Sequence, residues 1–160
     1  MAAAAYFETV QKIYIAFYQR PADPAGLKYW AEQINAAGGN PNAVITAFGT
    51  SPEATALYGA VNATTIGNVI EAIYQAAFNR AADAGGKAYW IAAFNAGTIT
   101  ASSIALAVVQ GATGGDDAIT IANKLQVANE FTKQVDGRAL TDPYFGTRSS
   151  FSATYKGDAD

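Results

Sequence analysis

The sequence predicts an all-α domain in which two tandem copies of one unit, with about four helices each, pack into a single helical domain. The first observation is a repeat, because residues 13–36 recur as residues 73–96 at an offset of 60 without a gap. The second is a helical period, since apolar residues fall three and four apart over much of the chain. Apart from alanines, the residues that coincide between the copies are Ile13 and Ile73, Tyr14 and Tyr74, Arg20 and Arg80, Asp23 and Asp83, Gly26 and Gly86, Tyr29 and Tyr89, Trp30 and Trp90, and Asn35 and Asn95.

Composition narrows the class of protein. Of 160 residues, 51% are apolar and 14% charged, which is typical of a compact domain. The net charge of −3, with no run of Lys or Arg, weighs against a nucleic-acid partner. The chain has no Cys and no His, which excludes thiolate metal sites and weighs against most hydrolase mechanisms. No N-terminal secretory signal is recognisable, and we expect no transmembrane segment.

In the first copy, the apolar period predicts a helix over residues 6–19, which the Pro21 step ends because the residue before a proline is pushed out of the helical region. Asp23 and Pro24 then form a start signal, since Asp accepts hydrogen bonds from free amides and Pro suits the first helical position. We expect this second helix to run to about residue 37. Asn-Pro and Ser-Pro steps repeat the signal and predict two short helices, over residues 41–48 and 52–58.

The second copy repeats this order with a weaker start. A helix is expected from residue 64 or 65 to residue 79, followed by a helix that Asp83 caps and that ends near residue 96. Ala84 stands where the first copy has Pro24. Thr100 is expected to cap the next helix, and Asp116 or Asp117 to begin the last one.

These elements set the expected domain limits. The copies cover residues 6–60 and 64–136, and together they form one domain over residues 1–136. Residues 137–160 show no sustained period, so we expect an extended or loosely docked tail.

A repeated corner, Arg20 with Asp23 and Arg80 with Asp83, lies between two predicted helices of each copy. The structural interpretation is that Asp caps the second helix while Arg pairs with it or with the last carbonyls of the first helix. The functional interpretation is that the corner offers fixed donors and acceptors to sugar hydroxyls, or that Asp and turn carbonyls hold a calcium ion.

Two aromatic pairs, Tyr29 with Trp30 and Tyr89 with Trp90, follow the corners. Adjacent residues on a helix point in different directions, so one member of each pair is expected at the edge of the core. The structural interpretation places Trp in the core and Tyr along a groove with a wet hydroxyl. The alternative is an exposed aromatic platform on which a pyranose ring stacks.

Candidates for metal binding and catalysis are sparse. Asp116 and Asp117 are weak candidates for a calcium site, because two acids at a helix start also suit the helix dipole without any ligand. The glutamates are scattered over solvent-facing helix positions, and no two of them are placed to act as acid and base. We therefore expect a protein without catalytic residues.

The segments YIAFYQRPADPAGLKYW and YQAAFNRAADAGGKAYW resemble the tandem helical repeat domain of unknown function found in bacterial S-layer and RTX-type secreted surface proteins. The segments AVITAFGTSPEATALYG and ITIANKLQVANEFTKQVD are similar to that family too, and the resemblance covers about residues 6–136. Ala84, Gly85 and Lys87 depart from the first copy.

The resemblance implies a non-enzymatic N-terminal module that anchors an S-layer protein to lipopolysaccharide O-antigen or another surface glycan on the outer membrane, with calcium as a helper ion. It also implies extracellular location after type I secretion, with the signal at the far C-terminus. The ligand-binding residues would be Arg20, Asp23, Tyr29, Trp30, Arg80, Asp83, Tyr89 and Trp90. One alternative is a lattice or adhesion module that contacts neighbouring S-layer subunits, and another is an accessory domain of a carbohydrate-active enzyme.

Overall fold

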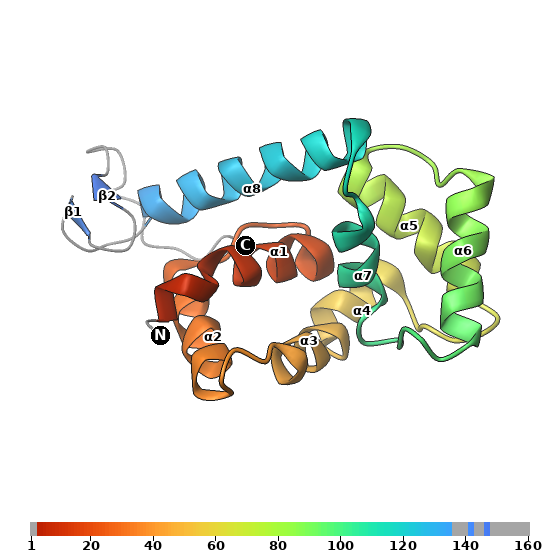
Figure 1. Cartoon of the computed structure of the whole chain (residues 1–160), viewed down its shortest axis with the longest axis horizontal. Coiled ribbons are helices and arrows are strands. Elements are labelled where there is room, and N and C mark those ends of the chain that lie inside the picture. The colour runs from red at the N-terminus through yellow and green to blue at the C-terminus, as the bar shows by residue number, and fades with distance from the viewer. Residues whose placement is uncertain (1–2, 136–140, 143–145, 148–160) are drawn as a thin grey trace.

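A computed structural model describes residues 3–135, 141–142 and 146–147 of the chain, and its helices fall into two groups of four (Figure 1). The first group follows a short 3-10 helix, η1 (Ala3–Tyr6), and contains α1 (Phe7–Tyr18), α2 (Pro24–Ala36), α3 (Asn42–Gly49) and α4 (Pro52–Tyr58). The second contains α5 (Ile66–Phe78), α6 (Ala84–Asn95), α7 (Ile104–Gly111) and α8 (Gly115–Val135). This arrangement confirms the all-α prediction.

The predicted tail falls almost wholly outside the described residues. Within it the structure describes β1 (Thr141–Asp142) and β2 (Gly146–Thr147), two short strands that pair antiparallel with Thr141 opposite Thr147.

Side-chain caps begin α2, α4 and α6 as the sequence predicts. The carboxylate of Asp23 accepts a hydrogen bond from the Gly26 amide at 2.6 Å, and Asp83 accepts from the Gly86 amide at 2.7 Å. Both caps have φ −69° and ψ 156°, so the start of α6 keeps its geometry without the proline of the first copy. Ser51 caps α4 by accepting from the Ala54 amide.

Helices α1 and α5 end where the sequence predicts, whereas one predicted cap is wrong. Both α1 and α5 end at a left-handed residue, Gln19 with φ 58° and Asn79 with φ 56°, although only the first copy has a proline nearby. The left-handed turn therefore ends these helices, and Pro21 is not required for it. Thr100 does not cap α7, because this helix begins at Ile104 and Thr100 lies in the preceding turn, where its amide donates to Ser103 Oγ.

Buried residues from both copies form one continuous apolar cluster. Its centre lies where α7 packs against both α1 and α5. The side chains of Ile13, Phe17, Ile70, Ile73 and Val108 are almost completely shielded from solvent there. Neither copy can be removed without exposing part of this core.

The long helix α8 connects the two copies. It begins beside the second copy, packs on α5, and then lies along α1 as far as α2 (Figure 1). The helices at the two ends of the molecule consequently differ in how far other helices shield them from solvent. Leu27, Ala31 and Ile34 of α2 are buried, whereas α6, at the opposite end, has no buried residue. Among the described residues, no helix has the length and hydropathy that crossing a bilayer requires.

Candidate functional site

The turn at each corner is built in the same way in both copies. In addition to the Asp caps, each turn needs a glycine three residues after the aspartate. A Cβ atom at Gly26 would lie 2.2 Å from Tyr14 Oη, and one at Gly86 would lie 2.7 Å from Tyr74 Oη. The repeated Asp, Gly and Tyr are thus explained by packing of the turn against the preceding helix.

Arg20 pairs with an acid that the sequence did not single out. Its Nε and Nη2 donate to the two carboxylate oxygens of Glu53, on α4, at 2.9 and 3.3 Å. The guanidinium also lies 5.3 Å from the centre of the Tyr14 ring. Burial raises the pKa of the Tyr14 hydroxyl well above its usual value, and the charge of Asp23 raises it further.

Arg80 repeats this arrangement with another acid. Its Nε and Nη2 donate to the two oxygens of Asp117 at 2.9 and 2.6 Å, and Nη1 lies 3.6 Å from Asp83. The guanidinium lies 5.0 Å from the centre of the Tyr74 ring. The hydrogen bonds to Asp117 raise the pKa of Arg80, while the Gly86 amide lowers the pKa of Asp83.

The weak calcium candidates Asp116 and Asp117 have different surroundings. Both oxygens of Asp117 accept from Arg80, whereas Asp116 is exposed in the first turn of α8. Among the described residues, no three His, Cys, Asp or Glu side chains gather to hold a metal ion. A calcium role for these two acids stays a prediction.

The aromatic pairs divide between surface and core. The exposed fractions of the Tyr29 and Tyr89 side chains are 53% and 64%, while Trp30 and Trp90 are half-buried. Within each pair the rings meet edge to face, with centroids 4.8 and 4.9 Å apart. The structure therefore places the tyrosine of each pair at the surface and the tryptophan beneath it.

A groove of about 310 Å³ opens beside the second corner. It is lined by Tyr74, Phe78, Tyr89, Trp90, Val108, Gly111, Ala112 and Asp117. Aromatic rings form much of its wall, and the Arg80–Asp117 pair supplies polar atoms at one side. This composition, apolar with a few fixed polar groups, is typical of a small ligand site.

Both repeats match one family model. Residues 5–58 and residues 45–112 each match the model of the domain of unknown function DUF4214, so each match contains one Arg–Asp corner. The chain belongs to the DUF4214 family. No curated protein and no solved structure matches the chain.

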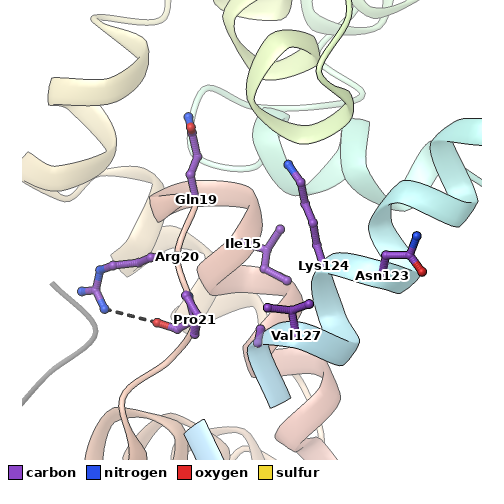
Figure 2. A pocket seen from close by; sticks show the side chains of 8 residues that line it. Ile15, Gln19, Arg20, Pro21, Asn123, Lys124 and Val127 are labelled. Carbon is purple, nitrogen blue, oxygen red and sulfur yellow. Dashed lines mark hydrogen bonds between the residues drawn. The ribbon is translucent and has the colours of Figure 1, made fainter. Parts of the chain in front are cut away.

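A second groove of this DUF4214 domain, of about 320 Å³, lies between the end of α1 and α8 (Figure 2). Ile15, Pro21 and Val127 form its apolar part, and the side chains of Gln19 and Lys124 extend past one end. Lys124 Nζ donates to the Ala76 carbonyl, and burial lowers its pKa. The side chain of Val127 is 66% exposed, so this groove presents an open apolar surface.

Sequence reasoning missed both acid partners and this second groove. Glu53 and Asp117 lie 33 and 37 residues from their arginines, so no local pattern connects them. The walls of the groove in Figure 2 come from the end of α1 and from α8, and the residues of one wall lie more than one hundred positions from those of the other in the sequence. Only the packed fold brings these walls together.

Proposed function

We propose that this DUF4214 domain is a non-enzymatic anchor of an S-layer-type cell-surface protein, located outside the cell, and that it binds lipopolysaccharide or another envelope polysaccharide. One observation carries the proposal. An exposed tyrosine, Tyr29 or Tyr89, recurs in each copy nine residues after an arginine that a carboxylate holds in place.

This combination suits a sugar. A pyranose ring offers C–H groups that pack on an aromatic face and hydroxyls that need both donors and acceptors. Arg20 and Arg80 hold their guanidinium groups in place by two parallel hydrogen bonds to a carboxylate. Because these groups are already oriented, a glycan loses little binding energy in ordering them.

The corner acids suit recognition better than proton transfer. Glu53 and Asp117 each accept two hydrogen bonds from an arginine, so both oxygens of each carboxylate already have a partner. A glycosidase instead needs two carboxyl groups that face the scissile bond across one cleft. In this proposal calcium is a helper ion that links exposed acids such as Asp116 to anionic groups of the polysaccharide.

The test is binding of the intact chain to lipopolysaccharide purified from its own source, with calcium and with a chelator. We expect saturable binding that is weakened, without loss of helical circular dichroism, by at least one of two double variants, Arg20→Ala with Tyr29→Ala and Arg80→Ala with Tyr89→Ala. Gln126→Ala, a change at an exposed position of α8, serves as a control. Absence of saturable binding in both buffers would overturn the proposal.

A lattice contact is the second candidate function, because α8 exposes two aliphatic side chains. Ile119 is 60% exposed and Val127 is 66% exposed, and Val127 lies at the groove of Figure 2. Apolar exposure of this kind is typical of interaction surfaces. Sedimentation velocity over a range of concentrations should then show self-association that Val127→Asp abolishes, and a monomer at every concentration would exclude it.

A further inference from the structure

In the first copy, the space beside the corner is filled by a side chain of the protein itself. Phe48 of α3 is 1% exposed. Its ring centroid lies 4.9 Å from that of Tyr14, 4.6 Å from that of Tyr18 in a stacked arrangement, and 5.2 Å from that of Trp30. These three rings therefore leave no room for a ligand ring between them.

In the second copy, the counterparts of those three rings line an open groove. Tyr74, Phe78 and Trp90 stand sixty positions after Tyr14, Tyr18 and Trp30, and all three line the groove of about 310 Å³. The residue sixty positions after Phe48 is Val108, which lines the same groove. A valine replaces the phenylalanine, so the space that one ring fills in the first copy is free in the second.

The size and walls of this free space fit one sugar ring. Its volume is at the small end of the roughly 300–1,000 Å³ range of ligand pockets, so it has room for one ring and not for a longer chain. Tyr89 is 64% exposed at its edge, and Trp90 Nε1 donates to Tyr74 Oη at 3.3 Å. The Tyr74 hydroxyl retains its own proton for a ligand oxygen.

The charges around the groove favour an uncharged ligand. Asp117 and Asp83 share the single guanidinium of Arg80, at 2.6 and 3.6 Å. One negative charge is therefore left over beside the groove, and an anionic sugar would be repelled. Carboxylate oxygens, in contrast, accept well from neutral hydroxyl groups.

We infer that the two copies are not equivalent, and that the second copy alone holds a ligand, which is a single neutral pyranose ring packed between Tyr89 and the Arg80–Asp117 pair. This inference rests on the proposed glycan-binding function. It adds the number of sites, the copy that carries the site and the class of sugar. The corner of the first copy, where Phe48 fills the space between the rings, has a structural role only.

The chain has two tryptophans, and each copy contains one of them, so the two indole N–H signals in an NMR spectrum report on the two corners separately. We would titrate the intact ¹⁵N-labelled chain with the methyl pyranosides of glucose, galactose and mannose, and with methyl glucuronide as an anionic counterpart. The signals are assigned with the Trp30→Phe variant. We expect at least one neutral pyranoside to shift the Trp90 signal saturably while the Trp30 signal stays in place, and the glucuronide to bind more weakly.

Two variants test the site, one by filling the groove and the other by removing a ring at its edge. Val108→Phe introduces the ring that fills the first copy, and Tyr89→Ala removes an exposed ring at no cost to the core; either should weaken binding about tenfold or more. Tyr29→Ala, the equivalent change in the first copy, should leave the affinity unchanged. Thermal unfolding of Val108→Phe verifies that the variant is folded, and Tyr89→Ala decides the question if it is not.

The outcomes separate this inference from the function on which it rests. A shift of the Trp30 signal, equal loss of affinity in Tyr29→Ala, or tighter binding of the glucuronide would overturn the single neutral site, although lipopolysaccharide binding could stand. Saturable binding to lipopolysaccharide with no shift of Trp90 by any neutral pyranoside would overturn it as well. A Trp90 shift with no binding to lipopolysaccharide would keep the site and refute the anchoring function.

Discussion

Replacing Gln11 with leucine tests whether buried hydrogen bonds hold α8 onto the first copy. Gln11 and Thr132 are both 0% exposed. Gln11 Oε1 accepts from the Ala22 amide at 3.0 Å, and its Nε2 donates to Thr132 Oγ1 at 2.7 Å. The Thr132 hydroxyl in turn donates to the Ala22 carbonyl at 2.5 Å. Three segments of the chain therefore meet in one closed polar network inside the core.

Leucine has a similar size but no polar atoms, so the variant leaves the Ala22 amide buried without a partner. An unsatisfied buried donor costs about 1–3 kcal/mol, out of a total stability of about 5–15 kcal/mol for a typical domain. For a domain of this length the cost corresponds to a fall in Tm of roughly 2–12 °C. Urea unfolding followed by circular dichroism would measure it.

The second copy supplies the matched control. Glu71 stands sixty positions after Gln11, and its Oε1 accepts from the Ala82 amide at 3.1 Å. Both residues are only half-buried, so water can replace the lost hydrogen bond in Glu71→Leu. We expect this variant to lose less than about 1 kcal/mol. A neutral effect of Gln11→Leu, or an equal cost in both copies, would refute the view that burial under α8 makes this network important.

Two further predictions concern tyrosine titration and close packing. Burial raises the pKa of Tyr58 to about 12, so the contribution of this group to stability is complete below pH 10 and is lost as the pH rises from 10 to 12. The free energy of unfolding should therefore fall over that pH range, and it should fall less steeply in Tyr58→Phe. An unchanged slope in this variant would contradict the prediction. A Cβ at Gly49 would lie 2.1 Å from the Ser102 carbonyl oxygen, so Gly49→Ala should cost about 1–3 kcal/mol. Gly114→Ala, where nothing lies within 4 Å, should cost much less, and similar urea midpoints for the two variants would count against the close contact.

Local signals in the sequence predict the helices and the turns well. Asp23, Ser51 and Asp83 begin helices by the capping bonds that their positions indicate. The apolar period locates the buried face of α1 and α5, and the orientation rule for adjacent residues anticipates that one member of each Tyr-Trp pair is exposed. These features depend only on residues a few positions apart, which is why one sequence suffices for them.

The partners of the arginines could not be predicted in this way. The repeat invites a search for an acid at the same offset in both copies, but the residue sixty positions after Glu53 is Thr113. The loop before α8 differs from the loop before α4, so the second acid is Asp117. Only the folded chain shows that the same role is filled from a different position. Gln11 was missed for a related reason, because its partner Thr132 lies 121 residues away.

The first copy carries uncharged residues at two positions where the second copy carries charged ones, and the cover that α8 provides explains this difference. In the first copy, which α8 covers, two of the repeated positions carry uncharged residues, the amide Gln11 in α1 and the apolar Leu27 in α2. In the open second copy the same two positions are Glu71 and Lys87, whose charged groups lie 3.3 Å apart and are partly exposed. An ion pair is costly to bury but costs little at a surface, so a neutral network suits the covered copy and charges suit the open one.

The same reasoning applies to the corners, where identical Arg, Asp, Tyr and Trp residues recur in both copies. Their identity alone would predict two equivalent sites. Phe48 in the first copy and Val108 in the second lie outside the repeated motif. These two residues decide whether the space between the rings is filled or free. If the second copy alone binds a ligand, the residues that differ around the motif select that copy, while the motif itself maintains the turn.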